Sequence, residues 1–364
     1  MLITEVSFSS VTGSVAAAGS VRDGSRRVCP VPSGQGHVVA LAPLSGITDV
    51  PFRQLVSTFG VPLVYSEMVA SGEFLKGDGK SLLRAAAVSG RFHAVQLAGR
   101  EPGAMRDAAR RLKDAGVDLI DINMGCPAKK VVGGQSGSAL MRDLDLASRL
   151  IAATIEGADG VPVTVKMRLG WDRSSLNAAD LAVRAQDLGA ALVTVHGRTR
   201  DQFYEGSADW SAISEVKKAV RLPVIANGDL VEVADRDRML DASGADGVMI
   251  GRASCGRPWF PALVAGSTSL RDLRAIRLAD LVVEHYEVML KHYGVSTGVR
   301  HARKHLGWYC DTAEKVIGAS IRADRAKLLA STEPGQVIEC LRRLLGSLSI
   351  ADVEQQTESA ELAA

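Results

Sequence analysis

The sequence lacks the features that mark several classes of protein. No two of its five cysteines form a Cys-x-x-Cys pair, so neither a disulfide framework nor a metal site is indicated. The formal net charge of +2 at pH 7 gives no global basic field, so a nucleic-acid partner needs a local patch. No apolar run approaches the roughly 20 residues that cross a bilayer, and residues 1–25 resemble no secretory signal. We therefore expect a cytoplasmic protein without a membrane or metal partner.

What the sequence does contain is a repeated unit of a short apolar run, a polar loop and a helical stretch. Runs of Val, Ile and Leu without alternation are typical of parallel strands that are buried on both faces. Eight such runs are Val38–Ala42, Leu63–Tyr65, Ala94–Leu97, Leu119–Ile122, Val163–Met167, Leu192–Val195, Val224–Ala226 and Gly247–Ile250. The clearest helical stretches between them are Pro102–Ala115, Leu144–Ile155, Ala178–Leu188 and Ser211–Val220.

Eight strand–helix units over ~225 residues match the usual size of a (β/α)₈ TIM barrel. The alternative is an open doubly wound sheet, but eight evenly spaced units fill a closed barrel without remainder. Strand-like runs stop beyond the eighth unit, and the following residues have apolar positions at helical spacing. We therefore predict an α/β protein with a barrel at residues 37–262 and a C-terminal all-helical domain at residues 270–346.

The two ends of the chain fit neither domain. Residues 1–36 match no motif, and we expect a flexible extension there. Residues 351–364 hold four acids, no base and no aromatic residue, which predicts a disordered acidic tail.

Polar residues follow many of the predicted strands, at the end where the active site of a barrel lies. The loops after strands 7 and 8 are the recurrent phosphate site, and here they read Asn227-Gly228-Asp229 and Gly251-Arg252. Their glycines let backbone N–H groups approach a phosphate, and the guanidinium adds a positive charge. Lys166 could neutralise a reduced flavin, while His196 and Gln96 could hydrogen-bond its ring edge. Because no Gly-x-Gly-x-x-Gly follows a strand, FMN is favoured over NAD.

Among these residues, Cys126 gives the most specific indication of a catalytic role. It lies in a Gly-Cys-Pro loop beyond the end of strand 4, although the usual fate of a free cysteine is burial as a small hydrophobe. A thiol is mostly protonated at neutral pH, so it can give a proton to a carbon–carbon double bond that has received a hydride. We interpret Cys126 as a general acid.

These motifs resemble the bacterial tRNA-dihydrouridine synthases, most closely the B type, over roughly residues 37–345. The resembling segments are Asp121–Val131, Gly137–Leu140, Val195–Thr199, Ile225–Asp229, Ile250–Arg252 and Ala302–His305. Two segments depart from the family: the first loop is Ala-Pro-Leu-Ser-Gly instead of Ala-Pro-Met-Ala-Gly, and the loop after Lys130 lacks the basic residues of some relatives.

The resemblance implies a monomeric enzyme that reduces specific uridines in tRNA to 5,6-dihydrouridine. FMN would deliver hydride to C6 of uracil, Cys126 would give the proton to C5, and NADPH would reduce the flavin. Asn123 and Arg168 would hold the flipped base. The implied FMN contacts are Pro43, Leu44, Ser45, Gln96, Lys166 and His196, with Asn227, Gly228, Asp229, Gly251 and Arg252 at its phosphate end.

A basic patch gives the implied tRNA a place to bind. Arg300, Arg303 and Lys304 share one helix face by i, i+3 and i+4 spacing, and no acid interrupts residues 288–310. A solvated basic face is the simpler reading of this patch. As an RNA site, it would hold phosphates while the barrel receives one extruded uridine.

Three other functions compete with this one. A dihydroorotate or dihydropyrimidine dehydrogenase would share the barrel and FMN but would not need a basic helical domain. An RNA-binding protein without turnover would not need Cys126, Lys166 and His196 together. A Schiff-base aldolase that uses Lys166 would leave Cys126 without a role.

Overall fold

A computed structural model describes residues 22–23, 26–27 and 37–361. The expected flexible extension at residues 1–36 lies mostly outside the described residues. Contacts divide the chain into two units. The barrel unit holds the described residues of Ser20–Val50 and Pro62–Gly251, and the helical unit holds Pro51–Val61 and the described residues of Arg252–Ala364.

The strands of the barrel unit confirm the predicted (β/α)₈ barrel. In the described part of the chain, eight parallel strands close in the order β10-β3-β4-β5-β6-β7-β8-β9. Because β10 pairs with both β3 and β9, the open sheet is excluded. The strands are β3 (Val38–Leu41), β4 (Leu63–Ala70), β5 (Ala94–Ala98), β6 (Leu119–Met124), β7 (Val163–Arg168), β8 (Leu192–His196), β9 (Val224–Asn227) and β10 (Gly247–Ile250). Two short strands, β1 (Arg22–Asp23) and β2 (Arg26–Arg27), pair separately and antiparallel.

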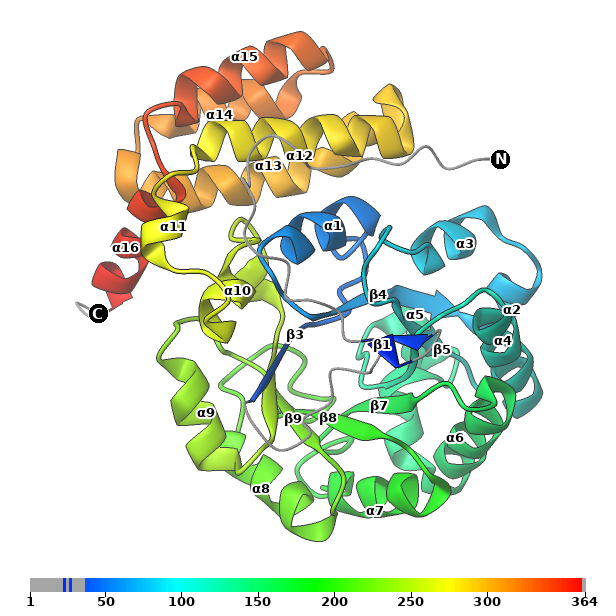
Figure 1. Cartoon of the computed structure of the whole chain (residues 1–364). Coiled ribbons are helices and arrows are strands. Elements are labelled where there is room, and N and C mark those ends of the chain that lie inside the picture. The colour runs from blue at the N-terminus through cyan, green and yellow to red at the C-terminus, as the bar shows by residue number, and fades with distance from the viewer. Residues whose placement is uncertain (1–21, 24–25, 28–36, 362–364) are drawn as a thin grey trace. The chain divides into compact units, whose positions relative to one another are not determined.

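Helices surround the strands of the barrel, as Figure 1 shows for α4 and for α6 to α9. The four helical stretches that the sequence predicted correspond to α4, α6, α7 and α8. Glycines in the left-handed region end α7 at Gly189 and α9 at Gly244, which lets the chain turn into the next strand. The helices of this unit are α2 (Ser71–Leu75), α3 (Gly79–Ala85), α4 (Pro102–Asp114), α5 (Lys129–Gly133), η1 (Gly137–Arg142), α6 (Leu144–Ala158), α7 (Ala178–Leu188), α8 (Trp210–Ala219) and α9 (Asp235–Ser243).

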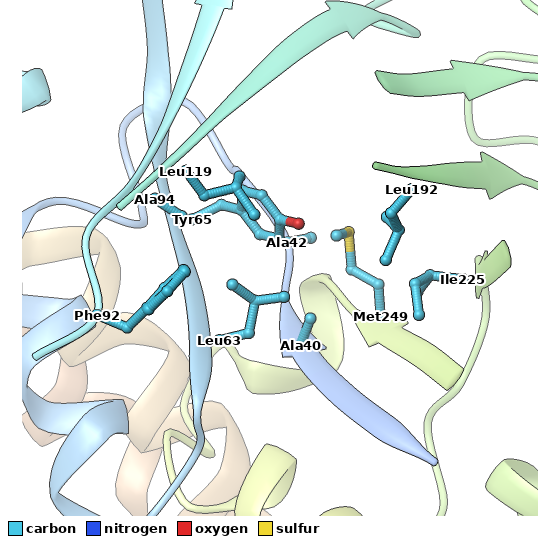
Figure 2. Close-up of a cluster of buried hydrophobic side chains, with 10 residues drawn as sticks. All are labelled: Ala40, Ala42, Leu63, Tyr65, Phe92, Ala94, Leu119, Leu192, Ile225 and Met249. Atoms are coloured by element: carbon cyan, nitrogen blue, oxygen red, sulfur yellow. The ribbon is translucent and has the colours of Figure 1, made fainter. Parts of the chain in front are cut away.

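The interior of the barrel is a packed apolar core rather than a channel. Figure 2 shows ten of its buried side chains converging from the strands, from Ala42, which follows β3, and from Phe92, which precedes β5. They include Leu63 and Tyr65 on β4 and Met249 on β10, all at most 1% exposed. Residues two apart on a strand point to the same side, so the next inward positions along each strand lie above this core.

The helical unit confirms the predicted all-helical region. Of the apolar positions at helical spacing, Val282, Tyr286 and Met289 on α12 are buried, whereas Tyr293 at its end is half-buried. Among the described residues, no helix combines the length and the apolar character that crossing a membrane requires. The helices of this unit are α1 (Val50–Thr58, whose first residue is assigned to the barrel unit), η2 (Arg252–Ser254), α10 (Phe260–Ala265), α11 (Leu270–Leu273), α12 (Leu278–Tyr293), α13 (Val295–Ile317), α14 (Ile321–Ala330), α15 (Pro334–Leu345) and α16 (Ile350–Glu361).

The expectation of a disordered acidic tail at residues 351–364 is wrong as far as residue 361, because α16 covers this stretch. Glu354 is fully buried and accepts hydrogen bonds from the Arg257 guanidinium and from Trp259 Nε1, the latter at 2.8 Å. Ser349 and Asp352 cap the helix start by bonding each other's backbone N–H groups. The prediction took every acid in this stretch to be a solvated charge, whereas Glu354 is buried and pairs with Arg257. Residues 362–364 lie outside the described residues.

Glu354→Ala should destabilise the protein by about 3–5 kcal/mol, because it leaves the buried Arg257 guanidinium without its carboxylate. Urea unfolding followed by circular dichroism measures the change. Glu339→Ala, at an exposed position of α15, is the matched control and should cost no more than ~0.5 kcal/mol. Equal stabilities of the two variants would show that α16 is not anchored through Glu354.

Candidate active site

The barrel interior changes from apolar to polar along its strands. On β6 the inward positions pass from Leu119, in the apolar core, to Asp121 and Asn123. On β8 they pass from Leu192 in the core to His196 at the strand end. The carboxyl ends of these parallel strands therefore carry a layer of polar side chains, which is where the sequence placed the active site.

A chain of hydrogen bonds links the buried Asp121 to the Cys126 loop. The Asp121 carboxylate accepts from Thr164 Oγ1 at 2.6 Å and from Gln96 Nε2 at 2.7 Å. Gln96 Oε1 accepts from Asn123 Nδ2 at 2.8 Å, and Asn123 Oδ1 accepts from the backbone N–H of Cys126 at 2.9 Å. Because an ionised carboxylate can only accept, it fixes which end of each amide points toward the cysteine loop.

The barrel interior changes the proton affinity of Asp121. Burial, the largest effect, raises the pKa of this carboxyl to about 6, while hydrogen bonds from Thr164 and Gln96 and the charge of Lys166 act in the opposite direction. The carboxylate is thus ionised at neutral pH and is held by these neighbours.

Cys126 lies half-buried at the start of the loop after β6. Its carbonyl accepts from the backbone N–H and the hydroxyl of Ser138, at 3.1 and 2.9 Å. A Cβ at Gly137 would lie 2.8 Å from that carbonyl, and Gly137 has a φ of +61°. The Gly-Ser pair of the sequence motif therefore holds the cysteine loop by close backbone approach. In contrast, Cys310 is fully buried, and burial raises its pKa to about 12.

Lys166 provides a cation at the same end of the barrel. Its Nζ donates to Asn227 Oδ1 at 2.9 Å, and Asn227 Nδ2 in turn donates to the carbonyl of Met249 at 2.8 Å. Burial lowers the pKa of Lys166 to about 8, although Asp121 and Cys126 act to raise it. The predicted residues Lys166 and Asn227 are thus brought together.

Arg168 holds the cysteine loop from the other side. Its guanidinium donates to the Gly125 carbonyl at 2.9 Å and to the Thr199 carbonyl at 2.7 Å. Only 1% of the residue is exposed, and burial lowers its pKa to about 10. This arrangement makes Arg168 a positioning residue for Cys126, whereas the sequence suggested only a contact with the base.

The loop after β9 is shaped by a glycine and an ion pair. Gly228 has a φ of +119°, and a Cβ there would lie 2.9 Å from the His196 ring and 2.8 Å from Ala208 Cβ. The Asp229 carboxylate accepts from both terminal nitrogens of the buried Arg198, at 2.9 and 2.6 Å. The Asp229 charge is therefore paired with the Arg198 guanidinium.

The first loop lies beside Gly251, as a cofactor site shared by the two would require. A Cβ on Gly251 would be 3.9 Å from Ala42 Cβ and from Leu44 Cδ2. Pro43 and Leu44 are half-buried and Ser45 is exposed.

The remaining predicted residues belong to the helical unit. These are Arg252 in η2 and the basic patch Arg300, Arg303 and Lys304 on α13. In the patch, Arg300 is exposed and the other two are half-buried. The opposite face of α13 is buried, at Val299, Ala302, Leu306 and Tyr309.

Sequence reasoning missed the supporting residues Asp121, Thr164 and Arg198. A signal for the first two was available, because both are polar residues at inward positions of buried strands. No local signal pointed to Arg198, since its partner Asp229 lies 31 residues away in sequence.

Asp121→Asn should change how stability depends on pH. The carboxyl has a pKa of 3.8 when unperturbed and about 6 in the folded protein, so between these values the folded state binds more protons. Stability from this group is therefore lost as pH rises, by about 1 kcal/mol from pH 5 to pH 7. In urea unfolding at pH 5 and pH 7, the variant should not show this decrease in the free energy of unfolding. Asp187→Asn, on the exposed side of α7, should keep it; a wild-type difference that survives in Asp121→Asn would contradict the assignment.

Comparison with known proteins places this chain in a family. The family model for dihydrouridine synthase (Dus) matches residues 40–342. A probable tRNA-dihydrouridine synthase of Rhizobium leguminosarum bv. phaseoli is 52% identical over 299 residues, which are 82% of this chain and 92% of that protein. The tRNA-dihydrouridine synthase B of Xanthomonas campestris pv. campestris is 46% identical over 282 residues, which are 74% and 83% of the two chains. This chain therefore belongs to the dihydrouridine synthase family.

Proposed function

We propose that this protein reduces specific uridines in tRNA to 5,6-dihydrouridine, with FMN as its bound cofactor and NADPH as the electron donor. The observation that carries the proposal is the half-buried Cys126, held by Asn123, Ser138 and Arg168 at the polar end of the barrel. Two relatives that cover most of this chain are named for the same reaction on tRNA.

The residues at the carboxyl end of the barrel fit FMN. The cofactor supplies hydride for transfer to C6 of the uracil ring. Gly228 lets the loop after β9 pack directly against the His196 ring, where a Cβ would clash. Lys166 provides a cation for an anionic ring, and Gln96 keeps one further N–H donor after its bond to Asp121. The phosphate end would rest on Asn227, Gly228, Gly251 and Arg252, with Asp229 acting through Arg198.

The protein's own task is to deliver one proton and to hold the base. Once C6 has gained hydride, the Cys126 thiol gives its proton to C5, so that one hydride and one proton add across the C5–C6 double bond. The thiolate left behind regains its proton from solvent. The Asn123 amide has a second N–H that can contact the uracil edge, while Arg168 keeps the loop in place.

The basic patch on α13 is the part of the helical unit that suits the tRNA backbone. Arg300 is exposed, and the buried Nε of Arg303 has no hydrogen-bond partner among the described residues. Cations on one helix face can neutralise neighbouring phosphates. A uridine in an unpaired part of the tRNA is extruded at the lowest cost.

Cys126→Ala should retain bound flavin and lose dihydrouridine formation by ~100-fold or more, because general acid catalysis contributes about that factor. The readout is the mass of nucleosides from an unmodified tRNA treated with enzyme and NADPH, alongside the flavin absorbance of each variant. Cys255→Ala, which removes another half-buried thiol, should stay within about two-fold of wild type. Full activity of Cys126→Ala would refute the proton-donor role.

A further inference from the structure

Arginine and aromatic side chains gather on three loops at the carboxyl end of the barrel. The Arg200 guanidinium carbon lies 4.6 Å from the ring centroid of Trp171 and 4.8 Å from that of Phe203. The guanidinium carbon of Arg142, at the end of η1, lies 4.8 Å from the Trp171 centroid. With Tyr204, these residues come from the segments that follow β6, β7 and β8. We call the five residues the arginine–aromatic rim.

Tyr204 connects the rim to the cysteine loop. The Arg168 guanidinium carbon lies 5.7 Å from the Tyr204 ring centroid, and the same guanidinium donates to the Gly125 carbonyl. Only one side chain therefore separates the tyrosine ring from the residue next to Cys126. The ring is nevertheless 53% exposed, although aromatic side chains usually bury most of their surface.

The loop that carries Tyr204 is held in a fixed shape. The buried Arg198 donates to the carbonyls of Glu205 and Gly206, at 3.1 and 2.6 Å. Phe203 has a φ of +49°, a conformation that a bulky residue adopts only when its surroundings impose it. The exposure of Tyr204 is therefore a consequence of the fixed loop conformation and not of loop flexibility.

The chemistry of the rim matches unpaired nucleotides. Aromatic rings and guanidinium planes both stack on nucleobases, and the guanidinium charge suits the phosphates between them. The buried Nε of Arg200 has no hydrogen-bond partner in the described part of the chain, so the rings are the contacts that hold this group. An apolar peptide would instead meet a cation beside Trp171 and Phe203, which disfavours it.

We propose that the arginine–aromatic rim binds the nucleotides flanking the target uridine, and that a neighbouring base stacks on Tyr204. This inference rests on the proposed function, because it takes the uridine at Cys126 as given. Tyr204 would then help to select the target, since only a uridine whose neighbour is also unstacked could reach the cysteine.

The test compares Tyr204→Ala with Tyr204→Phe in the FMN-loaded full chain. Tyr204→Ala should raise the Kd for an unmodified tRNA transcript about 5- to 100-fold, as for loss of one stacked base, and Tyr204→Phe should stay within about two-fold. Leu188→Ala is the control, because this partly exposed residue ends α7 at the opposite end of the barrel. Wild-type Kd values for both Tyr204→Ala and Trp171→Ala would overturn the proposal.

Transcripts with single abasic nucleotides beside the target identify the stacked base. For wild type, an abasic nucleotide at one of these positions should raise the Kd by the same factor as Tyr204→Ala does. For Tyr204→Ala, the abasic nucleotide at that position should raise the Kd no further. Additive losses at every flanking position would overturn the stacking. A fall in kcat with unchanged Kd would do the same, because it would mean that Tyr204 acts only through Arg168.

These binding measurements keep the inference separate from the proposed function. If wild type binds the transcript but forms no dihydrouridine, the proposed function fails, and the Kd ratios still decide whether Tyr204 stacks on RNA.

Discussion

The polar end of the barrel depends on one carboxylate placed where only hydrogen-bond donors can satisfy it. Asp121 lies 1% exposed inside the barrel, next to the apolar layer that includes Leu119, and burial raises its pKa. It is held by Thr164 and Gln96, and through the two amides of Gln96 and Asn123 it determines the orientation of the Cys126 backbone. A chain of this kind has one satisfied arrangement, so the cysteine loop is positioned before any ligand binds.

Three cations complete the same end of the barrel, and each is fixed by a different partner. Lys166 binds an amide oxygen of β9, Arg168 binds the backbone of two loops, and Arg198 binds the Asp229 carboxylate. Positive groups that are already oriented need no reorganisation when an anionic ring or phosphate arrives. The same bonds shape the loop after β8, which carries Arg200, Phe203 and Tyr204 of the arginine–aromatic rim. Cofactor, base and flanking nucleotides would therefore meet surfaces that share one framework.

The sequence predicted the barrel because each strand is a local pattern: a continuous apolar run that ends in polar residues. It also placed Cys126, Lys166 and His196 at one end, since parallel strands share their direction. What it could not give is pairing across long separations. Asp121 meets Thr164 from 43 residues away, and Glu354 meets Arg257 from 97 residues away. Composition gave no sign that the Glu354 carboxylate is buried, which is why α16 was expected to be part of a disordered tail.

The flavin absorbance of the purified protein tests the central claim most directly, when NADPH is added first and unmodified tRNA second. The account predicts oxidised-flavin bands that bleach with NADPH and return with tRNA, but not with free uracil or orotate. Bands that return with the small pyrimidine would indicate a dehydrogenase of free bases. No flavin bands, even after reconstitution with FMN, would contradict the assignment of the polar barrel end as a flavin site.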